Sequence, residues 1–217
     1  MTFNSLNYQQ ILENMGKYGT KNVKIVAVSK NHSVESIKIA INSGIRVFGE
    51  NRVQEAEKKF SNLKSSYQDL ELHLTGPLQT NKVKNAIKIF DLFQTLDREK
   101  LAKEFSKHAE LIKNKAFFIQ VNIGKEKTKS GIFPEEADDF IKYCKQDLKL
   151  NITGLMCIPP IDKNPKIYFK NLNDIAKKNN LIHLSMGMSG DYTEGLKCGA
   201  SYIRVGTLLF GNRNYEN

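Results

Sequence analysis

Short apolar segments alternate about eight times with helix-like segments along the 217 residues of this chain, and this alternation limits the fold more than any other feature. The first apolar segment is followed by Ser33, a good helix N-cap, and the helix-like stretch after it ends at Gly44. The same unit then recurs. The pattern predicts strands at residues 23–28, 46–48, 72–75, 92–96, 117–123, 152–158, 183–186 and 202–205.

Strands that alternate with helices form parallel sheets, and eight of them can close so that no sheet edge stays exposed. We therefore predict one α/β domain over residues 1–217, a single (β/α)8 TIM-type barrel with an N-terminal lead-in helix at 6–18. A doubly wound open sheet is the alternative, because periodicity does not show closure. The chain ends soon after the last strand, so we expect no second domain. Further helices are predicted at 34–42, 54–63, 82–89, 99–112, 135–143, 165–178 and 192–197.

Charge and cysteine content narrow the class of protein. The net charge of +10 comes mainly from lysines scattered along helical segments, which favours a solvated surface over a nucleic-acid site. No apolar stretch approaches the roughly 18 residues of a membrane-spanning helix, and the first 18 residues do not resemble a signal peptide, so we expect a cytoplasmic protein. Cys144, Cys157 and Cys198 are odd in number and far apart, which predicts reduced thiols and no local metal site.

Polar residues follow most of the predicted strands, at the barrel end where active sites form. Lys30 comes directly after the first strand. A lysine with a pKa of about 10.4 is almost fully protonated at neutral pH, so Schiff-base chemistry would require burial or nearby positive charge. Position alone favours a strand-end lysine whose amine reaches solvent. Three histidines, His32, His108 and His183, do not form a metal-ligand pattern, and His73 is predicted to be a core histidine.

The ends of the seventh and eighth strands carry the pattern of an anion site. Ser189 lies among glycines before a predicted helix, and Gly206 and Thr207 begin a turn after the last strand. Backbone N–H groups at such turns bind phosphates, although the glycines could also serve only to turn the chain. Arg204, one of only five arginines, lies within the last strand, so if it points inward it needs a buried partner.

Several motifs together resemble the pyridoxal phosphate homeostasis protein family (YggS/PROSC-like). The resemblance extends from about residue 23 to residue 213. It implies a barrel similar to the barrel domain of alanine racemase. Its motifs are VAVSK (26–30), FGENRVQE (48–55), HLTGPLQTNK (73–82), VNI (121–123), KSG (129–131), GLM (154–156), LSMGMSGD (184–191), RVGT (204–207) and FG (210–211).

This resemblance implies that the cofactor pyridoxal 5'-phosphate is bound as a Schiff base on Lys30. It also implies that Ser189, Gly206 and Thr207 bind the phosphate and that Arg204 faces the pyridine nitrogen, with Asn51 and Met156 beside the ring. The expected role is cofactor homeostasis, with transfer to apo-forms of pyridoxal phosphate enzymes, without catalytic residues or metal, and as a monomer.

Three other functions remain open at this point. An amino-acid racemase-like enzyme would use the same cofactor, and an aldolase would use Lys30 directly on a sugar phosphate. A nucleic-acid-binding module would use the positive charge and would show steeply salt-dependent binding.

Overall fold

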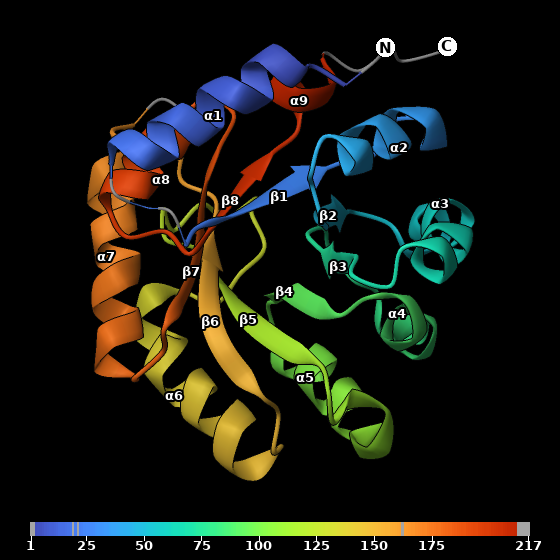
Figure 1. The fold of residues 1–217 in the computed structure, drawn as a ribbon. Coiled ribbons are helices and arrows are strands. Elements are labelled where there is room, and N and C mark those ends of the chain that lie inside the picture. Colours follow the sequence, from blue (N-terminus) through green and yellow to red (C-terminus); the bar gives the residue numbers. More distant parts are fainter. Residues whose placement is uncertain (1–2, 19, 21, 162, 212–217) are drawn as a thin grey trace.

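The first and last strands of the sheet pair with each other, and this pairing closes a parallel barrel of eight strands in sequence order (Figure 1). In β1 (Lys24–Val28) and β8 (Tyr202–Val205), Lys24 lies opposite Tyr202 and Ala27 opposite Val205. The computed structural model describes residues 3–18, 20, 22–161 and 163–211. Closure confirms the predicted TIM-type barrel and excludes the open sheet.

The helices lie between successive strands and cover the outside of the barrel (Figure 1). The remaining strands are β2 Val47–Glu50, β3 Glu71–Leu74, β4 Leu92–Leu96, β5 Ala116–Val121, β6 Ile152–Cys157 and β7 His183–Met188. The α-helices are α1 Ser5–Lys17, α2 Val34–Asn42, α3 Val53–Ser66, α4 Val83–Ile89, α5 Glu99–Ser106, α6 Ala137–Lys142, α7 Pro165–Lys178, α8 Tyr192–Lys197 and α9 Thr207–Phe210. Except for α9, which was not predicted, their bounds follow the predicted ones closely, with two exceptions.

Both exceptions are predicted helices that turn out to be composite. The helix expected at 99–112 stops at Ser106 and resumes as a 3₁₀ turn, Ala109–Ile112, because the backbone of His108 (φ −111°, ψ 36°) leaves the helical region. The helix expected at 135–143 begins with a 3₁₀ turn, Pro134–Glu136, and widens into a π turn, Tyr143–Asp147, after α6.

Along each strand, side chains alternate between the barrel interior and the layer that faces the helices, with a period of two residues. One buried cluster fills the middle of the barrel; its members are Val26, Val47, Leu92, Phe118, Met156 and Tyr202. Alternate residues such as Ala27, Phe48 and Ile203 pack outward under the helices in a much larger cluster. Buried polar side chains, among them His73 and Arg204, occupy further interior positions.

The lead-in helix α1 supports the end of the barrel chain. Ile11 and Met15 are buried, as their spacing predicts, whereas Leu6 is 81% exposed and does not belong to the packed face. The backbone N–H of Asn4 donates to the carbonyl of Leu209 at 2.7 Å, just before α1 begins. The helix therefore holds α9, which directly follows the predicted phosphate loop (Figure 1).

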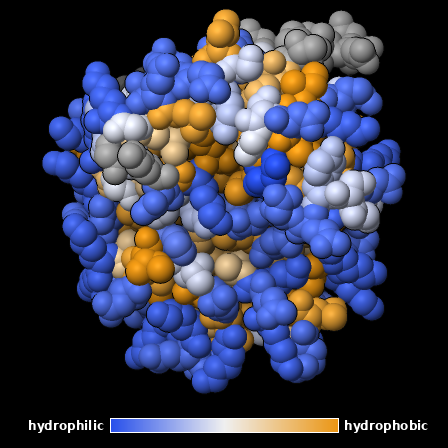
Figure 2. Space-filling view, viewed as in Figure 1, coloured by the Kyte–Doolittle hydropathy of each residue, from blue (hydrophilic) through white to orange (hydrophobic). Residues whose placement is uncertain are grey.

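The surface carries its positive charge in dispersed form. Hydrophilic side chains cover most of the face in Figure 2, with hydrophobic atoms toward its centre and top. In the lysine-rich stretch at 100–115, lysines pair with glutamates three or four residues away, as Lys103 does with Glu99 and Lys113 with Glu110. Among the described helices, none has the length and apolar character needed to cross a membrane.

Candidate functional site

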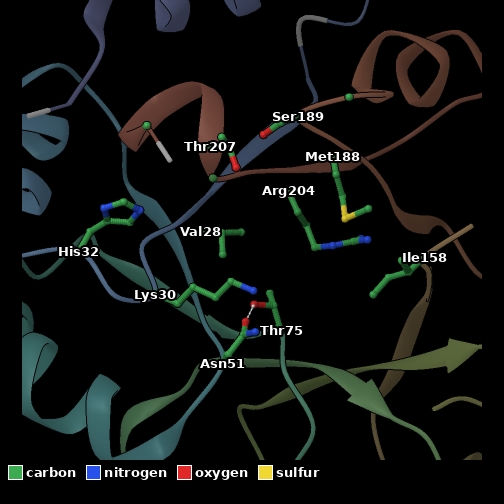
Figure 3. A pocket seen from close by; sticks show the side chains of 13 residues that line it. Val28, Lys30, His32, Asn51, Thr75, Ile158, Met188, Ser189, Arg204 and Thr207 are labelled. Carbon is green, nitrogen blue, oxygen red and sulfur yellow. Dashed lines mark hydrogen bonds between the residues drawn. The ribbon is translucent and has the colours of Figure 1, made fainter. Parts of the chain in front are cut away.

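A cavity of about 260 Å³ opens at the carboxyl ends of the strands, as the barrel fold predicts. Figure 3 shows Lys30 and Arg204 reaching into it, with the hydroxyls of Ser189 and Thr207 close together at one side. The lining residues are Val28, Lys30, His32, Asn51, Thr75, Ile158, Met188, Ser189, Gly190, Arg204, Gly206, Thr207 and Gly211.

Six of the seven residues predicted for the site come together in this cavity. They follow or belong to β1, β2, β7 and β8, and they are Lys30, Asn51, Ser189, Arg204, Gly206 and Thr207. Met156 lies elsewhere: its side chain is fully buried in the cluster in the middle of the barrel. Ile158, two residues further along the same face of the chain, lines the cavity instead.

The loop that carries Lys30 is anchored by a cluster of four residues, here called the Lys59 cluster: the buried Ser29 and Glu50 and the partly buried Glu55 and Lys59. The ammonium of Lys59 donates to the carbonyl of Ser29 at 2.8 Å and to Glu50 Oε1 at 3.1 Å. The hydroxyl of Ser29 donates to the same Glu50 oxygen at 2.7 Å. Both backbone and side chain of the residue before Lys30 are thereby fixed.

The residue after Lys30 is fixed by the same cluster. Asn31 has a left-handed backbone with φ of 62°, and its N–H donates to Glu55 Oε1 at 2.5 Å. Glu55 Oε1 also accepts from Lys59 at 2.6 Å. Because anchors lie on both sides of Lys30, the direction in which this side chain leaves the strand is set by α3 and not by the loop alone.

Within the Lys59 cluster, the burial penalty falls mainly on the carboxylate of Glu50. Its side chain is fully buried, and its Oε2 has no hydrogen-bond partner among the described residues. Burial raises the pKa of Glu50 above its ordinary value, while Lys59 and the Ser29 hydroxyl oppose the rise. The carboxylate thus depends on Lys59 for its charge.

The anion-binding side of the cavity is built from the ends of β7 and β8. Gly206 is the N-cap of α9, so the amides of Thr207 and Leu208 lack partners within the helix, and that of Leu208 donates to Ser189 Oγ at 3.4 Å. A Cβ at Gly206 would lie 3.2 Å from the carbonyl of Val28, which shows how closely the ends of β1 and β8 approach each other. Asp191 steadies the other loop by accepting the N–H of Met188 at 2.6 Å. Ser189 and Thr207 therefore present hydroxyls and backbone donors from two braced turns.

Arg204 lies inside the barrel, and it has the buried partners that an inward arginine requires. Its Nη1 donates to Ser185 Oγ at 2.7 Å and its Nη2 to the carbonyl of Cys157 at 2.8 Å. Burial lowers its pKa, and Cys157 and Asp191 counteract that shift. A guanidinium has five N–H donors, so donors remain for a ligand after these two bonds.

Sequence reasoning missed several lining residues and misplaced the depth of others. Thr75, at the end of the third predicted strand, donates to Asn51 Oδ1 at 3.0 Å and so orients that amide. The polar residues after the third strand line a neighbouring cavity instead, together with Arg52, Arg98 and Ser130. The strand period could have identified Val28 and Thr75, because they share the inward face with other lining residues. Arg213 lies outside the described residues.

The chain resembles known proteins over nearly its whole length. Residues 6–214 match the family described as "Alanine racemase, N-terminal domain". A pyridoxal phosphate homeostasis protein from Aquifex aeolicus (strain VF5) is 41% identical over 95% of this chain and 94% of its own length. Another protein of that name, from Haemophilus influenzae, is 38% identical over 96% of this chain and 94% of its own length.

Solved structures give the same relationship. PipY of Synechococcus elongatus PCC7942 with PLP bound is 32% identical, with a TM-score of 0.79 over 93% of this chain and 100% of its own. Alanine racemase of Clostridium difficile 630 is 16% identical, with a TM-score of 0.72 over 99% of this chain and 59% of its own, and so shares the fold. The chain belongs to the pyridoxal phosphate homeostasis protein family, whose barrel is the alanine racemase N-terminal domain.

Proposed function

We propose that this protein binds pyridoxal 5'-phosphate at the barrel mouth and takes part in intracellular pyridoxal phosphate homeostasis. The observation that carries the proposal is the single cavity where Lys30, Arg204 and the turns at Ser189 and Gly206 meet. An amine, a buried donor-only cation and paired anion-binding turns match the aldehyde, the pyridine nitrogen and the phosphate of this one cofactor. PipY, a relative with the same barrel, was solved with PLP bound.

Each group of the cofactor has a candidate partner in this chain. Lys30 would hold the aldehyde carbon as a Schiff base. Ser189, Gly206 and Thr207 would bind the phosphate through hydroxyl and backbone donors, as charge-assisted hydrogen bonds. Asn51, oriented by Thr75, would contact the side of the ring. Met156 could act only from beneath the cavity, because it is fully buried.

The chemistry of Arg204 favours holding the cofactor over using it. When bound, the cofactor supplies an electron sink that is strongest with a protonated ring nitrogen. Arginine can only donate, so a nitrogen that faces Arg204 accepts a hydrogen bond and stays unprotonated. Among the described lining residues there is also no tyrosine or carboxylate, which leaves Lys30 itself and the His32 imidazole as possible bases. We therefore propose a carrier or regulator without its own turnover.

The partners of such a carrier would be apo-forms of pyridoxal phosphate enzymes, and the protein would act as a monomer. A racemase-like enzyme with the same cofactor is the alternative, in line with the shared barrel fold. Catalytic turnover of D- or L-alanine that depends on Lys30 would favour this alternative over the carrier.

The test is an absorption spectrum of purified protein with added cofactor, before and after borohydride reduction, followed by mass spectrometry. We expect a cofactor-sized mass addition on the peptide that contains Lys30. Lys30→Ala should abolish this adduct, while Lys38→Ala, a change at an exposed lysine of α2, should leave it intact. An adduct of equal yield in folded Lys30→Ala protein would contradict the assignment. Trapping of a sugar phosphate without any cofactor would favour an aldolase instead.

A further inference from the structure

A chain of buried side chains extends from Arg204 down the inside of the barrel, away from the cavity. Arg204 contacts Ser185 of β7, and the Ser185 hydroxyl lies 2.6 Å from Gln94 Oε1 of β4. Gln94 Nε2 lies 2.8 Å from His73 Nδ1 of β3, and His73 Nε2 lies 2.8 Å from Glu71 Oε1. The side chains of Ser185, Gln94 and His73 are completely buried.

The direction of every hydrogen bond in this chain follows from the arginine. Arg204 can only donate, so Ser185 Oγ accepts from it and donates its own hydrogen to Gln94 Oε1. That oxygen assignment places the amide nitrogen of Gln94 against His73, where it donates to Nδ1. His73 must then carry its proton on Nε2 and donate to Glu71. All donors point away from the cavity, toward the carboxylate.

The far end of the chain is consistent with this direction. Burial raises the pKa of Glu71, but the hydrogen bonds from His73 and Lys24 and the charge of Lys24 outweigh it and hold the pKa at about 2. Glu71 is therefore an ionised acceptor at ordinary pH. Lys24 Nζ donates to its other oxygen at 2.7 Å. With a neutral His73, a donor-only group at one end and an acceptor-only group at the other leave one arrangement in which no buried polar atom is unsatisfied.

We propose that Ser185, Gln94 and His73 are positioning residues that fix the guanidinium plane of Arg204, through a hydrogen-bond chain that requires the Nε2–H tautomer of His73. With Nη1 committed to Ser185 and Nη2 to the Cys157 carbonyl, the plane is set by two acceptors. While Gln94 Oε1 takes the Ser185 hydrogen, the rotation of that hydroxyl is fixed and its lone pairs face Arg204. Gln94 in turn keeps that orientation only while His73 Nδ1 accepts.

The tautomer is measured in cofactor-free protein, so this arm does not depend on the proposed function. Nitrogen-15 NMR of the histidine rings distinguishes Nε2–H from Nδ1–H, and a His73→Asn variant assigns the signal. We expect Nε2–H in the wild type. Gln94→Glu, which is isosteric but can only accept there, should force a proton onto Nδ1 of His73. A wild-type Nδ1–H ring, or an unchanged tautomer in folded Gln94→Glu protein, would overturn the proposed chain.

The positioning of Arg204 is measured by two further signals. In cofactor-free protein, the Nη resonances of Arg204 should be resolved because rotation is blocked, and they should merge in Gln94→Leu. Where cofactor binds, which rests on the proposed function, Gln94→Leu should weaken binding by about tenfold and shift the absorption of the bound cofactor. Leu92→Ala, a cavity in the same strand and the same interior, is the matched control and should lower stability without that shift.

The outcomes separate the two proposals. If the wild type binds no cofactor, the proposed function fails, while the tautomer and the Nη signals still decide the positioning chain. If cofactor binds and folded Gln94→Leu keeps wild-type affinity, absorption and Nη signals, the chain does not position Arg204. An equal absorption shift in Leu92→Ala would likewise show that the effect is merely structural.

Discussion

Replacing Lys59 with methionine should test how the loop under Lys30 is held. The change keeps most of the side-chain length but removes the cation that contacts Ser29, Glu50 and Glu55 at 2.6–3.1 Å. Lys59 is only 11% exposed and Glu50 is fully buried, so solvent screens this pair little. Removing one partner of a buried ion pair costs about 3–5 kcal/mol, because the other charge stays buried and uncompensated. We expect a loss of that size in the free energy of unfolding at pH 7.5.

The loss should depend on pH in a defined direction. The pKa of Glu50 is already raised by burial, and Lys59 is the main influence that opposes the rise. Without Lys59 the pKa rises further, so the folded state binds a proton more tightly than the unfolded state. Its stability is then greatest below the unfolded pKa and falls as pH increases through the folded pKa. At pH 5 the loss should shrink to about 1–2 kcal/mol, the worth of the hydrogen bonds removed.

Urea unfolding at both pH values measures this difference, with two control variants. Lys58→Met, an exposed neighbour in α3, should change stability by less than about 0.5 kcal/mol. Glu50→Gln combined with Lys59→Met removes the charge and should abolish the extra loss at pH 7.5. Equal losses for Lys59→Met at pH 5 and 7.5, or no recovery in the double variant, would refute the view that a stranded carboxylate is the cause.

Three further predictions concern the cavity and its surroundings. Ser189→Ala combined with Thr207→Ala should weaken cofactor binding by about tenfold or more in an absorbance titration, because two charge-assisted hydrogen bonds are lost. Folded Arg204→Glu protein should shift the bound cofactor's spectrum and raise α-proton exchange from alanine in deuterated water, with a smaller loss of affinity. No spectral change would mean that Arg204 does not face the ring. Cys157, whose pKa burial raises to about 12, should resist thiol reagents until the protein unfolds, and rapid native labelling would contradict its burial.

The sequence predicted much of the site because the carboxyl ends of barrel strands converge, so residues that follow different strands meet there. The two-residue period put Arg204 on one face with Tyr202 and Gly206 without deciding which face points inward, and position after the strands led to Lys30, Ser189 and Thr207. Depth was harder to predict. Met156 and Ile158 lie on the same face, but the period does not say at which level a side chain meets the cavity, and only Ile158 reaches it.

The supports of the site were not predictable by the same reasoning. Lys59 is anchored to Ser29, thirty residues away, and Gln94 to Ser185, ninety-one residues away. Neither pair has a local pattern, because their distance is set by strand register and helix packing. His73 could be expected to be a satisfied core histidine, and it is one. Its tautomer became accessible only when the partner on each ring nitrogen was known.

The polar residues inside the barrel do not contribute as much to the stability of the fold as apolar residues in their place could. Buried charged and polar groups are often replaceable by apolar residues of similar volume at little or no cost, so packing alone does not require Arg204, Ser185, Gln94 and His73. Part of the interior is apolar, with Val26, Phe118 and the other members of their cluster, which shows that this barrel can be filled in that way. The polar chain instead ends at Arg204, which reaches the cavity. We infer that the chain is retained for the orientation of that guanidinium, since only there does it contact the proposed ligand site.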